Sequence, residues 1–374
     1  MRFVPARGDP SVYVPARVRR NGDAPTVAVV GAGPAGLSAA HHLSRLGYPV
    51  TLFEAEAEPG GMLSSAIPAY RLPRNVLRRE IASLLDENVT LRCGTALGRE
   101  VTIDGLFADG FKAVFLSMGA HRSSRLDLAG EDVAGIYPSL EFLKAYNTKG
   151  VELARGRVGV VGGGNAAVDA ARVALRQRDV RSVSLIYRRT YEDMPAYEEE
   201  IEAALEEGVT LQTLVSPVRI RYLEAAVAEG VSLETLVSPI KIYSKGGHLT
   251  GIECVRNQLG AVDASGRRRP VHVPGTEFDL PLDTLIVAIG ERPNSEGLDA
   301  AGLEIDKAGR VCADARTFRT RREGVFAGGD LVTGPYTVVS AIASGKRAAA
   351  VIDRYLHSRP LEEPPAIRRP TVFV

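Results

Sequence analysis

The sequence contains few cysteines, and they lie far apart. Cys93, Cys254 and Cys312 are the three cysteines among 374 residues, and no two of them have the CxxC spacing or the spacing of a metal-ligand set. We therefore expect no disulfide framework, no dithiol relay and no metal site. The same cysteine usage fits a reducing environment, so a cytoplasmic location is predicted.

Long apolar runs and an excess of charge are also absent. No run approaches the roughly 18 apolar residues of a membrane span, and residues 1–20 lack the apolar core of a signal peptide. Lys and Arg number 46 against 45 Asp and Glu, so the whole-chain charge does not indicate binding to nucleic acid or to a membrane surface. A chain of 374 residues is too long to fold around one hydrophobic core of ordinary size, so we predict two or three domains.

Residues 26–54 have the pattern of a strand, a glycine turn, a helix and a second strand. An apolar run at 27–30 leads to Gly31, Gly33 and Gly36, a helical pattern follows, and a second apolar run ends at Glu54. In a dinucleotide site these glycines permit the tight turn, the approach of a pyrophosphate and close helix–strand packing, in that order. The helix N-terminus attracts phosphate, and Glu54 would accept hydrogen bonds from a ribose diol. Glycines also mark ordinary turns, but the flanking elements and the acid predict a dinucleotide site.

A second pattern of the same kind begins about one domain later. An apolar run at 158–161 meets Gly162, Gly163 and Gly164, followed by a predicted helix from Asn165 and a predicted strand at 183–187. Ala167 stands where the third glycine of the fingerprint would be, which slightly loosens the helix-to-strand approach. Two fingerprints a domain apart are far more specific than one.

The two fingerprints end differently. The second has no acid after its second strand but Arg188 and Arg189. Guanidinium groups attract a ribose 2′-phosphate, whereas a carboxylate there repels it. The pair therefore predicts NADPH rather than NADH, unless it simply lies in solvent.

Residues 201–222 and 223–244 form a tandem duplication with a 22-residue offset, in which IEAALEEGVTLQTLVSPVRI is matched by LEAAVAEGVSLETLVSPIKI. Two copies are too few for a solenoid. We predict that one copy fills a sheet position and that the other lies outside the sheet or adds a layer.

The two ends of the chain carry weaker signals. Residues 1–25 are rich in arginine and predict either a solvated arm or a strap that docks on a partner. Near the other end, Gly329 and Asp330 precede a predicted helix, an arrangement that suits the ribityl and phosphate portion of FAD although it also occurs in ordinary turns. That helix carries small residues, so something can approach it closely: Ser340, Ala341, Ala343, Ser344, Ala348 and Ala349.

Taken together, the motifs resemble the two-dinucleotide flavoprotein (pyridine nucleotide-disulfide oxidoreductase) superfamily. The segments that carry the resemblance are GAGPAG with Glu54, PGGML, SMGA, GGGNAA, YRR, AIGERPN and GGDLVTGPYTVVSAIASGK. Within the superfamily the chain is most similar to the small (beta) subunit of NADPH-dependent glutamate synthase. The resemblance implies an α/β fold with two Rossmann-like three-layer dinucleotide-binding domains, the second inserted in the first. It implies an FAD domain at 26–120 and 291–374 and an NADPH domain at 121–290.

The resemblance also implies the cofactor-binding residues. For FAD they are Gly31, Gly33, Pro34, Ala35, Gly36, Glu54, Gly61, Met62, Arg71, Gly329, Asp330 and Val338. For NADPH they are Gly162, Gly164, Asn165, Ala166, Arg188 and Arg189. No catalytic side chain and no metal ligand are assigned, because the two cofactors carry the chemistry.

The implied activity is hydride transfer between NADPH and FAD, with electrons passing to an external acceptor. Glutamate synthase beta subunits carry a cysteine-rich iron–sulfur segment ahead of the FAD fingerprint, and residues 1–25 contain no cysteine. We therefore expect an iron–sulfur protein or partner subunit as acceptor. The alternatives are a stand-alone reductase of the ferredoxin–NADP type and a flavin-binding assembly subunit that does not turn over NADPH.

Overall fold

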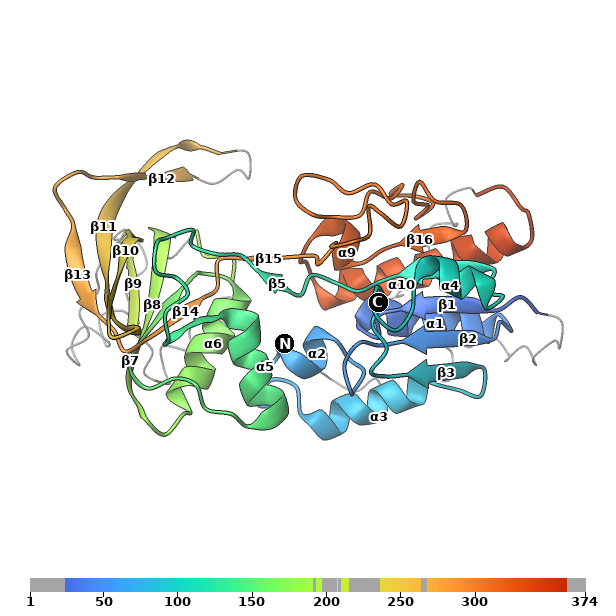
Figure 1. Cartoon of the computed structure of the whole chain (residues 1–374), viewed down its shortest axis with the longest axis horizontal. Coiled ribbons are helices and arrows are strands. Elements are labelled where there is room, and N and C mark those ends of the chain that lie inside the picture. Colours follow the sequence, from blue (N-terminus) through green and yellow to red (C-terminus); the bar gives the residue numbers. More distant parts are fainter. Residues whose placement is uncertain are drawn as a thin grey trace, which may run out of the picture. The chain divides into compact units, whose positions relative to one another are not determined.

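The structure is a computed structural model that describes residues 24–190, 193–196, 207, 210–214, 236–263 and 268–361 (Figure 1). The predicted N-terminal arm, apart from its last two positions, and most of the 201–244 duplication lie outside these residues. The chain forms two compact units. The first unit takes in the chain up to Gly61, Arg78–Gly119 and the chain from Ser295 on, and the second unit takes in Met62–Leu77 and Ala120–Asn294.

A parallel sheet forms the centre of the first unit. Its strands run in the order β16, β4, β1, β2, β3, and every neighbouring pair is parallel. β1 and β4 are buried along their whole length, as expected of a parallel sheet covered on both faces. The strands are β1 (Val27–Val30), β2 (Val50–Phe53), β3 (Val89–Arg92), β4 (Ala113–Leu116) and β16 (Val325–Ala327).

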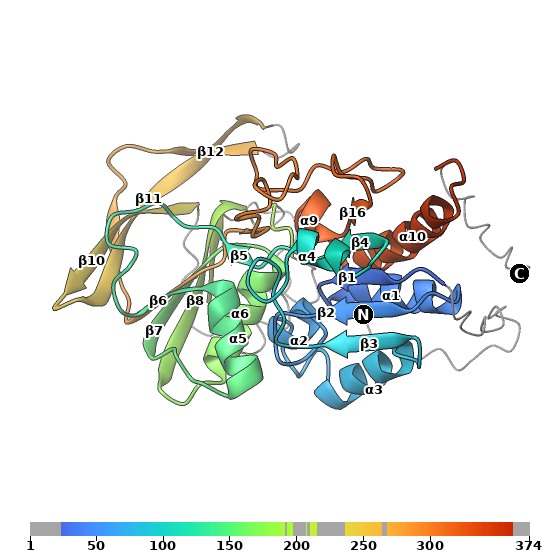
Figure 2. The same cartoon turned by 45° about the vertical axis from the view of Figure 1, so that its right-hand side comes forward.

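Helices α1 and α10 pack closely against each other in this unit (Figure 2). A Cβ atom on Gly345 of α10 would lie 2.0 Å from the main-chain oxygen of Ala35 in α1, so the two main chains meet where α10 has no side chain. Ser38 of α1 also donates a hydrogen bond to the carbonyl of Ile342, at 2.8 Å. The small residues of α10 therefore allow α1 to pack closely against it. The helices of this unit are α1 (Pro34–Arg45), α4 (Ile103–Ala108), α9 (Asp330–Thr333), α10 (Val338–Leu356) and most of α3 (Arg74–Leu84).

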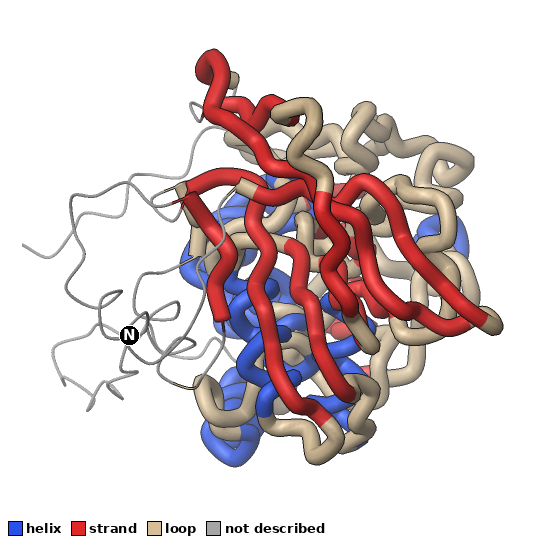
Figure 3. Tube along the Cα trace, turned by 90° about the vertical axis from the view of Figure 1, so that its left-hand side faces the viewer, coloured by secondary structure: helices blue, strands red, loops and turns tan. Residues whose placement is uncertain are grey.

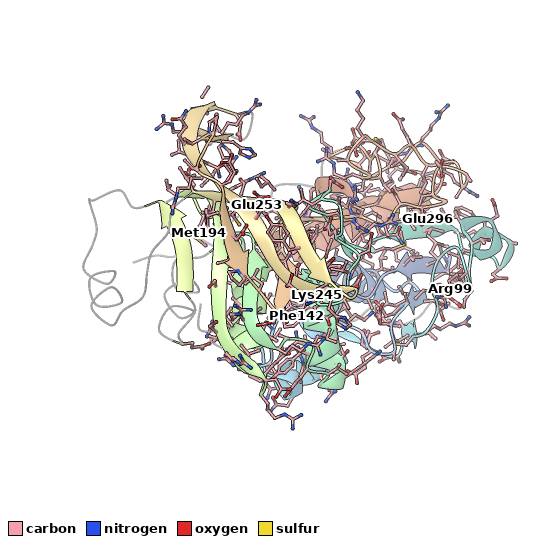
Figure 4. All side chains as sticks on the ribbon, turned by 60° about the vertical axis from the view of Figure 1, so that its left-hand side comes forward. Arg99, Phe142, Met194, Lys245, Glu253 and Glu296 are labelled. Atoms are coloured by element: carbon pink, nitrogen blue, oxygen red, sulfur yellow. The ribbon has the colours of Figure 1, made fainter. Side chains whose placement is uncertain are left out.

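The second unit also contains a parallel sheet, in the order β6, β14, β7, β8, β9. Phe142 and Met194, labelled in Figure 4, belong to the apolar core that this sheet shares with helices α5 and α6. The elements are β6 (Ile136–Pro138), α5 (Ser139–Lys149), β7 (Gly156–Val161), α6 (Asn165–Leu175), β8 (Val180–Thr190), β9 (Thr210–Leu214) and β14 (Thr284–Val287).

An antiparallel sheet follows β9 in the second unit, and its strands are drawn red in Figure 3. β11 pairs with β10, β12 and β13, and a short ribbon joins β5 to β15. The strands are β5 (Arg122–Ser123), β10 (Val237–Lys245), β11 (His248–Val262), β12 (Arg268–His272), β13 (Phe278–Pro281) and β15 (Glu291–Arg292).

The two copies of the tandem duplication contribute to different sheets. β9, from the first copy, pairs in parallel with β8. β10 begins near the end of the second copy and pairs antiparallel with β11. Among the described residues of the duplication, those of the first copy enter the parallel sheet.

The segment Met62–Leu77, which includes α2 (Met62–Ser65), clusters with the second unit. Asn147 of α5 donates a hydrogen bond to the carbonyl of Ala66 at 2.9 Å, and Arg71 forms an ion pair with Asp169 of α6 at 2.7 Å. The predicted domain boundaries place this segment in the FAD domain, so the compact units differ from them here. None of the described helices combines the length and the apolar character needed to cross a membrane.

We predict that Gly345→Ala destabilises the protein, although alanine favours helices over glycine by about 1 kcal/mol. The new Cβ would overlap the Ala35 carbonyl, and we expect a loss of about 1 to 3 kcal/mol in the free energy of unfolding, measured by urea denaturation. As a control, Ala343→Ser on the exposed side of the same helix should change it by less than about 0.5 kcal/mol. A more stable Gly345→Ala variant would contradict the close approach of α1 and α10.

Candidate functional site

The turn between β1 and α1 is held by main-chain contacts. Gly31 has a φ of +100°, and a Cβ atom there would lie 2.6 Å from the carbonyl oxygen of Ser117, at the end of β4. A Cβ on Gly36 would lie 1.8 Å from the Gly31 oxygen. The Ser117 hydroxyl donates to the carbonyls of Val30 and Gly31, at 3.0 and 3.1 Å. Gly31 and Gly36 are therefore required by the fold of the turn itself, and Ser117 is a part of it that the sequence did not assign.

Gly33 is different, because protein atoms do not crowd it. The nearest atom to a Cβ placed there is the Cα of Gly61, at 4.0 Å. Gly61 approaches from the loop after β2, and its own Cβ would lie 2.9 Å from the Cα of Gly33. The Cβ position of Gly33 is thus free of close protein contacts, which fits a pyrophosphate lying against main chain.

The helices that follow the two fingerprints begin without a side-chain cap. Gly33 caps α1, with Pro34 in its first turn, and Gly164 caps α6. By contrast, Thr102 and Thr337 accept hydrogen bonds from main-chain N–H groups at the starts of α4 and α10. The N-cap residues of α1 and α6 therefore supply no capping side chain, which is consistent with a helix end that binds an anion.

Glu54 is buried at the end of β2 and is 7% exposed. Its Oε2 accepts a hydrogen bond from the N–H of Ala32 at 2.7 Å, and its Oε1 accepts one from the N–H of Glu56 at 2.9 Å. Burial raises the pKa of Glu54, and the hydrogen bonds from Glu56 and Ala32 oppose that rise. A carboxylate has about four acceptor positions, so Glu54 keeps capacity for a ribose diol.

The turn before α9 lies against the start of α1. A Cβ on Gly329 would lie 2.9 Å from the Cβ of Ala35, and the Gly329 N–H donates to the Ser344 hydroxyl of α10 at 2.8 Å. Burial raises the pKa of Asp330, and a hydrogen bond from the main chain of Tyr336 opposes the rise. Val338 begins α10 and is exposed. The first unit thus contains these residues of the predicted FAD set: Gly31, Gly33, Pro34, Ala35, Gly36, Glu54, Gly61, Gly329, Asp330 and Val338.

Met62 and Arg71, also predicted to bind FAD, belong to the second unit. The Arg71 guanidinium donates to Asp169 Oδ2, and the Asp169 side chain is 6% exposed. The FAD assignment of these two residues came from the resemblance and stays a prediction, as does that of the ten residues in the first unit.

The turn of the second fingerprint, between β7 and α6, is packed as tightly as the first turn, but against different atoms. A Cβ on Gly162 would lie 2.1 Å from the oxygen of Ala288, after β14, and a Cβ on Gly163 would lie 2.6 Å from the ring of Tyr187. Tyr187 donates to the carbonyl of Asp193 at 2.8 Å. Gly164 is open, with Pro195 Cγ at 3.9 Å from its Cβ position, and Asn165 and Ala166 open helix α6. Tyr187 is thus a structural part of the turn that the sequence did not identify.

Arg188 and Arg189 occupy different environments. Arg188 is exposed and Arg189 is buried. Arg189 forms an ion pair with Asp263 at 2.7 Å, and its Nε donates to the carbonyl of Arg268 at 2.8 Å. Within the described part of the chain, no three His, Cys, Asp or Glu side chains are grouped so as to hold a metal ion.

A family model described as pyridine nucleotide-disulphide oxidoreductase matches residues 25–345. The chain is 46% identical over 333 residues to the NADP(+)-dependent formate dehydrogenase subunit beta of Moorella thermoacetica, which covers 88% of this chain and 44% of that protein. It is 36% identical over 346 residues to the NADPH glutamate synthase small chain of Escherichia coli K12, covering 88% and 68%. The chain therefore spans less than half of the first relative and about two thirds of the second.

Among solved structures, FprA of Mycobacterium tuberculosis in complex with NADPH matches with a TM-score of 0.73 at 20% identity, covering 90% of this chain and 85% of that one. At this identity the likeness concerns the fold. The prediction of two dinucleotide-binding domains, the second inserted in the first, is confirmed, as is the resemblance to the glutamate synthase small subunit.

We predict that Asp330→Asn stabilises the protein without cofactor at pH 7. The raised pKa of Asp330 means that the folded state disfavours the ionised carboxylate, so the penalty is complete above the folded-state pKa and disappears as the pH falls below the unfolded-state value of about 3.9. The melting temperature of the variant should exceed that of wild type at pH 7, and the gap should close toward pH 4. Asp299→Asn, at an exposed position, serves as the control. A variant that melts lower than wild type at pH 7 would contradict the prediction.

Proposed function

The chain belongs to the pyridine nucleotide-disulphide oxidoreductase family, and from this premise we propose that it transfers hydride between NADPH and FAD and passes the electrons to a separate acceptor protein. Family membership and the named relatives confirm the predictions of an oxidoreductase with FAD and NADPH as cofactors. The assignment of individual residues and the acceptor are the proposal.

We place FAD in the first unit. The observation that carries this choice is that the Cβ position of Gly33, the N-cap residue of α1, has no protein atom closer than 4.0 Å and that Gly33 supplies no capping side chain. The α1 N–H groups and the helix dipole would hold the pyrophosphate, and Glu54 would accept hydrogen bonds from the adenosine ribose. Asp330 and the main chain at Val338 would hold the remainder of the cofactor.

We place NADPH in the second unit. Gly164 leaves the start of α6 open to a pyrophosphate, with Asn165 and Ala166 in the first turn. Arg188 lies exposed near the end of β8, on the strand beside β7 and therefore beside the turn that β7 enters. When bound, the two cofactors supply the redox chemistry. The chain binds and orients them, as expected where cofactors react directly.

The proposed acceptor is an iron–sulfur protein or a partner subunit that carries iron–sulfur clusters. The relatives are named as subunits, the formate dehydrogenase subunit beta and the glutamate synthase small chain, which supports a partner. The sequence has no CxxC pair to relay electrons through a dithiol. An inert assembly subunit is the less favoured reading, because the duplication leaves β9 in its place beside β8.

We expect anaerobic addition of NADPH to bleach the visible absorbance of the FAD-loaded protein, and NADH to do so at least about tenfold more slowly at equal concentration. Stopped-flow absorbance near the flavin maximum measures both rates. Persistent yellow colour with NADPH would refute hydride transfer and favour the assembly subunit. Equal rates with the two nucleotides would refute the assignment of NADPH.

We also expect Glu54→Gln to weaken FAD binding by about 10- to 100-fold, measured by fluorescence titration of the apoprotein. Glutamine has one acceptor oxygen, so it cannot keep the hydrogen bonds from the N–H groups of Ala32 and Glu56 and also accept from the ribose diol, and the loss of such a bond to the ribose is worth about 1 to 3 kcal/mol. Glu56→Gln is the matched control, since Glu56 is exposed and should change the affinity less than threefold, that is by under about 0.7 kcal/mol. Equal effects of the two substitutions would exclude Glu54 from the site.

A further inference from the structure

Large apolar side chains are exposed around the start of α10, in the first unit (Figure 2). Ten such side chains are exposed among the described residues, and four of the ten are close together in the sequence: Tyr336, Val338, Val339 and Ile342. Single exposed apolar residues are ordinary on a protein surface, whereas a cluster of them marks a surface that another molecule covers.

Val339 and Ile342 lie on one face of α10 together with Lys346. Residues three, four and seven positions apart lie on the same side of a helix. Val339 is 69% exposed, Ile342 is 44% exposed and Lys346 is exposed as well. The opposite face, which carries Ala341 and Gly345, is buried and includes the close approach to α1. We call Val339, Ile342 and Lys346 the outer face of α10, and α1 does not cover it.

Positive charge borders the outer face. Lys346 and Arg347 are both exposed, and neither forms an ion pair with an acidic side chain of the described residues. Burial lowers the pKa of His42 in α1, and neighbouring positive charges, Lys346 among them, lower it further. The outer face therefore suits a partner whose contact surface is apolar at its centre and acidic at its rim.

The outer face begins beside the predicted FAD site. Val338 is the first residue of α10 and belongs to the residues predicted to bind FAD. Since a helix rises 1.5 Å per residue, Lys346 lies only about 12 Å from Val338 along the helix axis. Electron transfer between two proteins requires a short distance between their redox groups. A protein that covers the outer face would be placed to take electrons from a flavin held at the start of α10.

We propose that the outer face of α10 is the docking surface for the electron acceptor, and that this acceptor is an acidic iron–sulfur protein of the ferredoxin type. The inference rests on the proposed function, because it assumes that FAD binds in the first unit and passes its electrons on. Val339 and Ile342 would form the apolar centre of the contact, and Lys346 and Arg347 would attract the acidic rim of the partner. In the net reaction one NADPH becomes NADP⁺ and a proton, and two iron–sulfur clusters each gain one electron.

The test uses the FAD-loaded full-length protein and, as probe, an acidic ferredoxin that carries two four-iron, four-sulfur clusters. Titration calorimetry measures the binding of the ferredoxin, and ferredoxin-dependent reduction of cytochrome c by NADPH measures its KM. Lys346→Glu should weaken binding and raise the KM about tenfold at low ionic strength, and by less than about threefold in about 0.5 M NaCl, where the charges are screened. Val339→Gln should weaken binding about three- to tenfold at either ionic strength, because it removes an apolar contact.

Lys112→Glu is the matched control. Lys112 is exposed and directly precedes β4, at the edge of the parallel sheet opposite to the fingerprint turn. This variant should change the binding of the ferredoxin by less than about threefold, because the same change of net charge then lies away from the docking surface. A control as impaired as Lys346→Glu would reduce the effect to net charge and overturn the inference.

Other occupants of the outer face would give different results. If Val339→Gln lowers the affinity for FAD, the cofactor itself covers the face. If wild type is a dimer and Val339→Gln is a monomer by sedimentation, a second copy of the chain covers it. Either result overturns the inference. The Lys346→Glu measurement decides the question even if Val339→Gln does not fold.

Failure of the proposed function has a separate signature. Reduction of ferricyanide by NADPH needs no docked protein, so its rate should be the same in wild type and in the three variants. Wild type that does not reduce ferricyanide refutes the proposed function, and the inference fails with it. Wild type that reduces ferricyanide but neither binds nor reduces the ferredoxin overturns the inference alone.

Discussion

The structure depends on how closely main chain approaches main chain around the first turn of α1. Three glycines make this possible: Gly31 beside the Ser117 carbonyl, Gly36 beside the Gly31 carbonyl and Gly345 beside the Ala35 carbonyl. A methyl group at any of these positions would overlap an oxygen atom. Because the turn is fixed from β4 and from α10 at once, the N–H groups at the start of α1 have a set direction before any ligand arrives. That is the preorganisation a pyrophosphate site needs.

The second unit reaches a similar turn with different contacts. Gly162 lies against the Ala288 carbonyl, and Gly163 lies against the Tyr187 ring. A side chain therefore helps to fix the shape of this turn, whereas main-chain contacts fix the turn in the first unit. Ala167 occupies the position of Gly36, and its Cβ lies 3.1 Å from the position that a Cβ on Gly162 would take. The looser helix-to-strand approach expected from the alanine stays a prediction. The aromatic residue directly before the arginine pair, Tyr187, therefore helps to hold this turn by packing against Gly163.

Local patterns allowed the prediction of local features. The strand, turn and helix of each fingerprint, the acid Glu54 and the small face of α10 all follow from short-range spacing, and the structure contains them. Features that depend on distant partners were beyond the sequence. The burial of Arg189 requires Asp263, which is 74 positions away, and an arginine pair after a strand gives no sign that one member is already neutralised. Nor does a duplicated strand sequence reveal that β8 accepts the first copy, since both copies carry the same pattern.

The segment Met62–Leu77 is held to α6 by charged and aromatic side chains. The resemblance assigns Met62 and Arg71 to FAD, yet Arg71 is paired with Asp169, one turn into the helix whose start is assigned to NADPH. The guanidinium groups of Arg172 and Arg176 lie over the Tyr70 ring, at 4.5 and 4.1 Å from its centroid, as in a cation–π interaction. Glu207 accepts hydrogen bonds from both arginines, and although burial opposes its ionisation, those bonds lower its pKa to about 2. Glu207 therefore stays charged and paired with both arginines across the physiological pH range, and the arginines in turn hold the Tyr70 ring of this segment against α6.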